Sequence, residues 1–250
     1  MNGIVFYPAG STPALTYALQ RLEALGCNIA NTPNEAVTHL LLPVPSFEKD
    51  GSLRGGGELE HILSGLSENV TVIGGSLQQH GYKTIDLLQD QLYLAENAAI
   101  TADCAVRIAR NNLPTVLKGC PVLVLGWGRI GKCLAQMLKA AGAEVTVAAR
   151  KEADIAMAQA LGYRAEYIEK LGFSLMRYRV IFNTAPAAVL SEEQVTHCRE
   201  DCVKIDLASK IGIAGKNVIW ARGLPGKDAP ESSGALIAKT VVRLISGREC

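Results

Sequence analysis

Three glycines near the middle of the chain have the spacing of a phosphate-binding turn. They stand in the order Gly126-Trp127-Gly128-Arg129-Ile130-Gly131, after a short apolar run and before apolar residues at helical spacing. A glycine turn between a strand and a helix lets a pyrophosphate approach the backbone, and the helix N-terminus supplies unpaired N–H groups. A glycine turn without a ligand is the alternative. Because a strand and a helix flank the motif, we predict that all six residues bind a dinucleotide.

The end of the next strand bears on which dinucleotide is bound. An NAD site places Asp or Glu there, about 20 residues on, to accept from the ribose 2′-hydroxyl. Here the strand ends in Arg150 and Lys151, and Arg150 lies 19 residues after Gly131. Two cations suit a 2′-phosphate, and a solvated basic pair is the less favoured alternative. The pattern favours NADP, with NAD as the less favoured cofactor.

Two later strands end in polar residues that could face the same ligand. One is followed by Asn183-Thr184-Ala185-Pro186, and the other by Asp206-Leu207-Ala208-Ser209-Lys210. Ligands of open α/β sheets gather at the carboxyl ends of the strands. We therefore expect Asn183–Pro186 to contact the ribose or the nicotinamide amide. Asp206 either belongs to the site or simply caps a turn.

These residues must be positioned by alternating strands and helices. The pattern predicts an α/β protein with two Rossmann-like parallel-sheet domains joined by a long helix, with a C-terminal helix that returns to the first domain. Residues 1–85 form the first, substrate-side domain, together with the C-terminal helix at 230–247. Residues 86–112 form the linking helix, and residues 115–229 form the NADP-binding domain.

Composition excludes several other classes of protein. The 25 Lys+Arg nearly balance 24 Asp+Glu, which argues against binding to nucleic acid or an anionic membrane. No apolar run reaches the length of a membrane span, and the start lacks the pattern of a signal peptide, so a cytoplasmic protein is expected. No Ser-His-Asp set or paired carboxylates support hydrolysis.

The seven cysteines are odd in number and irregularly spaced. Cys198 and Cys202 lie four residues apart beside His197, which resembles half of a metal site, but the sequence has no second half. Reduced thiols and no metal are therefore expected.

Several stretches resemble the family of dipicolinate synthase A subunits from spore-forming bacteria. The resemblance is good from about residue 86 onward, and it is thinner before that, where the first domain is also shorter than in the family. The glycine turn is common to many Rossmann enzymes, whereas the stretches Ile205–Lys210 and Gly223–Gly226 are more specific. The matching stretches are Val122–Gly131, Val145–Arg150, Ile181–Pro186, Ile205–Lys210 and Gly223–Gly226.

The resemblance implies an NADP-linked oxidation of dihydrodipicolinate, formed from 4-hydroxy-tetrahydrodipicolinate, to dipicolinate. This reaction branches from lysine biosynthesis during sporulation. The resemblance also implies a small dicarboxylate substrate held between the domains. It further implies a flavoprotein-like B subunit of the synthase as a partner. A homo-oligomer is a separate option. For such a substrate we assign Lys210 as an orienting cation or proton relay with Asp206 as its partner. The substrate-side residues are Asn97, Thr101, Ser209, Gly223 and Pro225.

Two other functions remain open at this point. One is an NADP-dependent dehydrogenase of another small carboxylic acid, such as a shikimate-like substrate. The other is a non-catalytic regulatory subunit that senses NADP.

Overall fold

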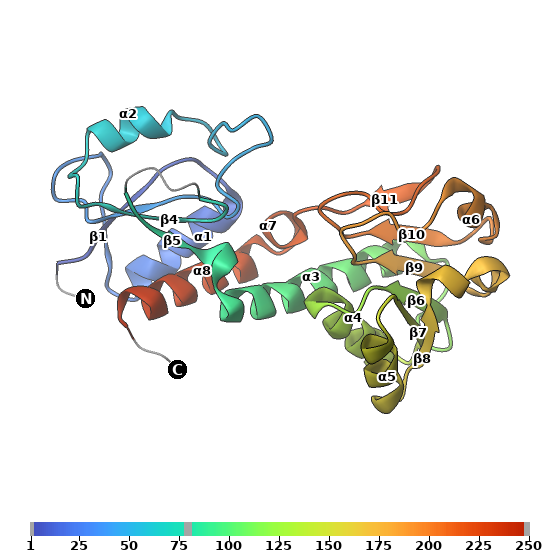
Figure 1. The fold of residues 1–250 in the computed structure, drawn as a ribbon. Coiled ribbons are helices and arrows are strands. Elements are labelled where there is room, and N and C mark those ends of the chain that lie inside the picture. Colours follow the sequence, from blue (N-terminus) through green and yellow to red (C-terminus); the bar gives the residue numbers. More distant parts are fainter. Residues whose placement is uncertain (1–2, 78–81, 248–250) are drawn as a thin grey trace. The chain divides into compact units, whose positions relative to one another are not determined.

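The computed structural model describes residues 3–77 and 82–247 of the chain (Figure 1). The chain divides into two compact units. Unit 1 comprises Met1–Asn97 and Pro225–Cys250, and unit 2 comprises Ala98–Leu224. Among the described residues, no helix combines the length and the apolar character needed to cross a membrane.

Unit 1 is built on a five-stranded sheet whose paired strands are all parallel, in the order β2-β1-β3-β4-β5. The central strands are the most buried, because helices and loops cover the sheet. Its strands are β1 (Val5–Pro8), β2 (Asn28–Ile29), β3 (His39–Leu41), β4 (Thr71–Gly74) and β5 (Lys83–Asp86), and its first two helices are α1 (Pro13–Ala24) and α2 (Leu59–Ser64).

The C-terminal helix α8 (Pro230–Ile245) packs on α1 within this unit, as predicted, and Figure 1 shows the two side by side. The helices come so close at Gly234 that an added Cβ would lie 2.5 Å from the Cβ of Tyr17. Two ion pairs join α8 to the chain at the start of the long linking helix: Lys239 with Glu96 at 2.7 Å, and Arg243 with Asp90 at 2.6 Å. The apolar face of α8 therefore completes the core of unit 1.

The long helix α3 (Gln91–Asn112) starts five residues later than the sequence predicts. Residues 83–86 form strand β5 instead, and a short 3-10 helix, η1 (Leu87–Gln89), follows. The Asp86 carboxylate accepts hydrogen bonds from the backbone N–H groups of Leu88 at 2.8 Å and Leu77 at 3.0 Å. The bond from Leu77 ties the end of β5 to the chain after β4, and the bond from Leu88 caps η1. The helix runs without a break through Asn97.

Unit 2 is a six-stranded sheet with the order β11-β10-β9-β6-β7-β8, and its paired strands are all parallel. This is the strand order of a doubly wound dinucleotide-binding sheet. The predicted α/β class with two parallel-sheet, Rossmann-like domains is therefore confirmed. The strands are β6 (Pro121–Leu125), β7 (Glu144–Ala149), β8 (Arg164–Tyr167), β9 (Val180–Asn183), β10 (Val203–Asp206) and β11 (Val218–Trp220).

Helices of unit 2 cover this sheet, and α4 (Arg129–Ala140) and α5 (Glu152–Ala160) pack on β6, β7 and β8. Strand β8 was not predicted from the sequence, because its residues Arg-Ala-Glu-Tyr are polar and lie at an edge, where one side meets water. The remaining helical segments are η2 (Ile168–Lys170), η3 (Gly172–Arg177), α6 (Glu192–Thr196) and α7 (Leu224–Asp228), which starts at the last residue of unit 2.

Candidate dinucleotide site

The order of the strands in unit 2 reverses between β6 and β9, which lie side by side with Leu125 opposite Asn183. The crevice beyond the carboxyl ends of such strands is where sheets of this type bind ligands. The turn after β6 and the loop after β9 meet there. Thr184 donates its N–H to the Leu125 carbonyl oxygen at 2.8 Å and its hydroxyl to the same oxygen at 3.0 Å. The two predicted segments are thus adjacent.

The three glycines of the turn have three different surroundings. Gly126 has a φ of +102°, and a Cβ there would lie 2.6 Å from the hydroxyl oxygen of Thr184. A Cβ at Gly131 would overlap the carbonyl oxygen of Gly126, so that glycine permits close contact of helix and turn. Gly128 has no atom within 4 Å of an added Cβ. The turn therefore leaves open space at the one glycine where a pyrophosphate would approach.

Gly128 is also the N-cap of α4, so no side chain caps the first N–H groups of that helix. Unpaired N–H groups and the positive end of the helix dipole favour a phosphate at this position. The residues present therefore fit a dinucleotide. Within the helix start, Arg129 is exposed and Ile130 is half-buried.

Trp127 differs from its neighbours, because its side chain is 6% exposed and packs edge-on against Tyr163, with ring centroids 5.5 Å apart. Its indole Nε1 has no hydrogen-bond partner among the residues that the structure describes. The Trp127 ring thus joins the turn to the chain after α5.

Arg150 and Lys151 directly follow β7, which pairs with β6 so that Ala148 lies opposite Leu125. Both side chains are exposed, and Lys151 is the N-cap residue of α5. The basic pair therefore stands at the carboxyl edge of the strand next to the glycine turn.

Asn183 and Asp206 form a buried pair at the ends of β9 and β10, and both side chains are 0% exposed. Asn183 donates its Nδ2 to Asp206 at 3.0 Å and to the Ala185 carbonyl oxygen at 3.1 Å. Its Oδ1 accepts the N–H of Ala185 at 2.9 Å. Both N–H groups of the Asn183 amide and one lone pair of its oxygen are thus used within the protein, where they hold the loop in place.

The Asp206 carboxylate accepts three further hydrogen bonds, all from backbone N–H groups. The donors are Ala208 at 3.0 Å, Gly212 at 2.7 Å and Ile213 at 3.0 Å. With Asn183, each carboxylate oxygen has two donors. This differs from the expectation that Asp206 partners Lys210 in catalysis, because a fully buried carboxylate with four donors has no acceptor capacity left. The Asp206 carboxylate therefore fixes the path of the loop that follows β10.

The loop after β10 wraps around this carboxylate and carries Ser209 and Lys210 on its exposed side. Gly212 was missed from the sequence, although a Cβ there would overlap the Ala187 carbonyl oxygen and lie 2.6 Å from Asn183 Nδ2. The available signal was a glycine six residues after an aspartate at a strand end. The loops after β9 and β10 are therefore locked to each other.

Comparison with known proteins gives one match that lies almost wholly in unit 2 and others that extend over both units. Residues 96–199 match the model of the D-isomer specific 2-hydroxyacid dehydrogenase, NAD binding domain. Over 251 aligned residues, the chain is 24% identical to the A subunit of dipicolinate synthase from Bacillus subtilis (strain 168), covering 89% of this chain and 82% of that protein.

Solved structures give the same result for the fold. The crystal structure of the dipicolinate synthase A subunit from Bacillus halodurans has a TM-score of 0.85 with 22% identity, and the match covers 98% of each chain. The corresponding crystal structure from Bacillus subtilis has a TM-score of 0.84 with 19% identity over 99% of this chain and 97% of that one. The resemblance to the A subunit of dipicolinate synthase is confirmed.

The matched domain indicates a nicotinamide dinucleotide cofactor and a dehydrogenase-like role.

The residues that the family resemblance assigns to the substrate fall into both units. Thr101 (7% exposed), the exposed Ser209 and Gly223, which has a φ of +67°, belong to unit 2. Asn97 and Pro225 belong to unit 1. Their role toward a substrate stays a prediction.

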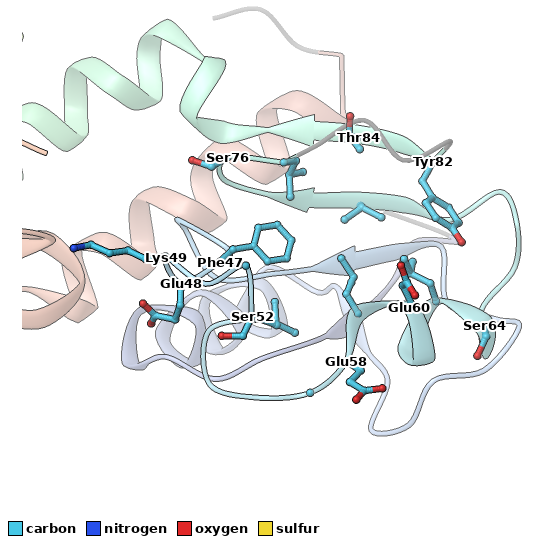
Figure 2. A pocket seen from close by; sticks show the side chains of 17 residues that line it. Phe47, Glu48, Lys49, Ser52, Glu58, Glu60, Ser64, Ser76, Tyr82 and Thr84 are labelled. Carbon is cyan, nitrogen blue, oxygen red and sulfur yellow. The ribbon is translucent and has the colours of Figure 1, made fainter. Parts of the chain in front are cut away.

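Unit 1 holds a cavity of about 1030 Å³ of its own (Figure 2). Its apolar wall includes Phe47, Leu53 and Tyr82, which also pack in the core of the unit. Glu48 and Glu58 add carboxylates to the lining, as Figure 2 shows. The residues predicted for cofactor, substrate and catalysis are not part of this lining.

Proposed function

We propose that this chain is an NADP-dependent oxidoreductase that converts dihydrodipicolinate to dipicolinate, as the A subunit of a dipicolinate synthase. The observation that carries the proposal is the resemblance to that subunit over 89% of the chain, together with the open glycine turn in unit 2. The setting we propose is the cytoplasm of a sporulating cell, on a branch from lysine biosynthesis. Its proposed partner is the flavoprotein-like B subunit of the synthase.

The reaction balances with few demands on the protein. Loss of water from 4-hydroxy-tetrahydrodipicolinate gives dihydrodipicolinate, and its oxidation releases a hydride and a proton as the ring becomes aromatic. NADP supplies the hydride acceptor when it is bound. The chain's own part is to bind the pyrophosphate at the N–H groups of α4 and to hold the substrate ring in place through the locked loops after β9 and β10.

A substrate with two carboxylates is held best by cations and N–H donors. Lys210 is exposed on a loop that the Asp206 carboxylate fixes from inside. We propose that Lys210 orients one substrate carboxylate, while Asp206 acts only by shaping the loop.

The preference for NADP is proposed from Arg150 and Lys151, which follow the strand beside the glycine turn. Replacing Arg150 by Ala should weaken NADPH binding roughly tenfold, because a charge-assisted bond to the 2′-phosphate is lost, and should leave NADH binding nearly unchanged. Arg177→Ala, at an exposed position before β9, is the matched control. Equal calorimetric affinities of the unchanged protein for NADPH and NADH would refute the preference.

The reaction is tested with 4-hydroxy-tetrahydrodipicolinate and NADP, with and without the B subunit. The expected result is growth of the NADPH absorbance together with terbium luminescence from dipicolinate. Absence of both signals when the two proteins are present together would refute the proposed reaction. A shikimate-like substrate or NADP sensing without turnover would then be the better account.

The role of Lys210 has its own test in the same assay. Lys210→Ala should lower turnover about tenfold or more and leave NADP affinity nearly intact, because the group acts on the substrate. Lys216→Ala, exposed in the same unit, should behave like the unchanged protein. Normal turnover by Lys210→Ala would remove Lys210 from the site without refuting the reaction.

A further inference from the structure

A cluster of two thiols and a buried ammonium group lies at the amino end of β10, the opposite end of the strand from Asp206. Cys198 follows α6, Cys202 immediately precedes β10, and Lys204 lies within the strand. Cys202 is 5% exposed and Lys204 is 6% exposed, whereas Cys198 is half-buried. The candidate dinucleotide site is at the carboxyl ends of the strands, so this cluster is separate from it.

The two thiols contact each other across a tight turn. The N–H of Cys202 donates to the Arg199 carbonyl oxygen at 3.1 Å, which turns the chain back on itself. Cys198 packs against the same apolar cluster that contains Cys202, and the two side chains are close enough to share a hydrogen bond. The Cys202 Sγ also lies 4.0 Å from the Val203 carbonyl oxygen, which is a weaker acceptor than a thiolate.

The surroundings separate the two thiols chemically. The hydrogen bond from Cys202 lowers the pKa of Cys198 to about 7, although partial burial opposes this, and the Lys204 ammonium group contributes in the same direction. The same hydrogen bond and burial raise the pKa of Cys202. Lys204 is anchored in place, because its Nζ donates to the Cys202 carbonyl oxygen at 3.1 Å. Cys198 therefore has the lower pKa of the two thiols and is the one that ionises first.

We propose that Cys198 and Cys202 form a dithiol site that reacts with small disulfides, with Cys198 as the attacking sulfur and Cys202 as the resolving one. A half-exposed thiolate beside a protonated partner is the arrangement in which such exchange is fast. The described residues include no group of three or more His, Cys, Asp or Glu side chains placed to hold a metal ion. A two-electron thiol–disulfide exchange is what this pair can do.

The exchange has two balanced steps. The Cys198 thiolate attacks one sulfur of the small disulfide, so a mixed disulfide forms at Cys198 and one small thiolate leaves. The Cys202 sulfur, having lost its proton to the departing thiolate or to water, then attacks the Cys198 sulfur. The Cys198–Cys202 disulfide forms and the second small thiol leaves. The small disulfide is reduced by two electrons, and the protein dithiol is oxidised by two.

The test treats the reduced, folded full-length chain with dithiodipyridine, followed by alkylation and peptide mapping by mass spectrometry. The expected first product is a Cys198–Cys202 disulfide, with two equivalents of pyridine thione released at the same rate. Cys202→Ser should stop after one equivalent and keep a stable mixed disulfide at Cys198. Cys198→Ser should slow the fastest reacting phase by about tenfold or more.

Cys133→Ser is the matched control, because Cys133 is also half-buried in unit 2 but lies on α4. It should leave the rate and the product unchanged. Reaction first at Cys133 or at another cysteine would overturn the proposal, and so would a lasting mixed disulfide at Cys198 in the unchanged chain. Mapping of the unchanged chain alone decides the matter if a serine variant fails to fold. NADPH affinity should be the same before and after oxidation, since the cofactor edge is not involved.

Discussion

Helices α1 and α4 occupy the same place in their two sheets, directly after the first strand, yet their N-termini differ. At α1, the Thr12 hydroxyl caps the helix by accepting the N–H of Leu15 at 3.2 Å. The unit's own chain also covers the turn, because Ser11 donates its N–H to the Arg54 carbonyl oxygen at 3.0 Å. At α4, the cap is Gly128, which has neither a side chain nor a neighbour within 4 Å of an added Cβ.

The difference shows that a strand–helix turn is not in itself a binding site. Unit 1 closes its turn with atoms from residues 53–55, and a Cβ at Gly10 would overlap the Arg54 carbonyl oxygen. Unit 2 keeps the corresponding space free and leaves the first N–H groups of α4 without a side-chain cap. The parallel-sheet topology is shared, but only the second turn has room for a phosphate.

The largest expected effect comes from removing the Asp206 carboxylate, which holds together the loops after β9 and β10 beside the turn before α4. Asp206→Ala would leave four buried donors without their acceptor, so the free energy of unfolding of unit 2 should fall by about 3–5 kcal/mol. Both tryptophans of the chain, Trp127 and Trp220, lie in unit 2. Denaturation followed by tryptophan fluorescence therefore measures this unit.

Asp103→Ala provides the control for that experiment, because Asp103 is exposed on α3 in the same unit. Its effect should stay within about 0.5 kcal/mol. If Asp206→Ala were equally mild, the four hydrogen bonds would not be what holds the loops after β9 and β10.

The second effect is expected at the open turn itself. Gly128 has a φ of −79°, and its Cβ position is empty, so Gly128→Ala should fold normally. The new methyl group occupies the approach of the pyrophosphate, and calorimetry should show NADPH affinity lowered at least about tenfold. Gly65→Ala is the matched control, since Gly65 also has a negative φ and ordinary contacts in unit 1. Unchanged affinity in Gly128→Ala would mean that the phosphate binds elsewhere.

The smallest effect is expected at the turn before α1, which residues 53–55 cover. Thr12→Ala removes the side-chain cap of α1 and should lower the local stability of that helix by about 1 kcal/mol. Denaturant-dependent hydrogen exchange of the α1 amides measures this loss, with the exposed Thr16→Ala as the comparison. NADPH affinity should not change. A drop in affinity would show that α1 also takes part in binding, and the contrast between the two turns would fail.

Local patterns in the sequence were enough to predict much of the fold. Thr12-Pro13 is a local start signal for α1, because an N-cap hydroxyl and a proline at the first turn act within a few residues. Strand β7 (Glu144–Ala149) is an apolar, buried run and so also carries a local signal. The polar strands β5 and β8 were missed, because neighbouring strands and distant hydrogen bonds, not apolar periodicity, place them at the sheet edges.

The candidate site could likewise be predicted only where it depends on a local sequence pattern. The glycine turn carries its own local signature, so its position was clear. That Asp206 accepts four hydrogen bonds within the protein could not be inferred from the sequence. Its donors are Asn183 and three N–H groups of a loop whose path is set by tertiary packing. Likewise, no local pattern shows that residues 53–55 cover the turn after β1.

Hydrogen–deuterium exchange with and without NADPH tests the contrast between the two turns most directly, because it follows both in one sample. We expect slower exchange on adding NADPH at the amides of residues 128–132 and 184–187, next to the open turn. The amides of residues 10–15 should exchange at the same rate in both samples. Protection at residues 10–15, or none at residues 128–132 under saturating NADPH, would contradict the account.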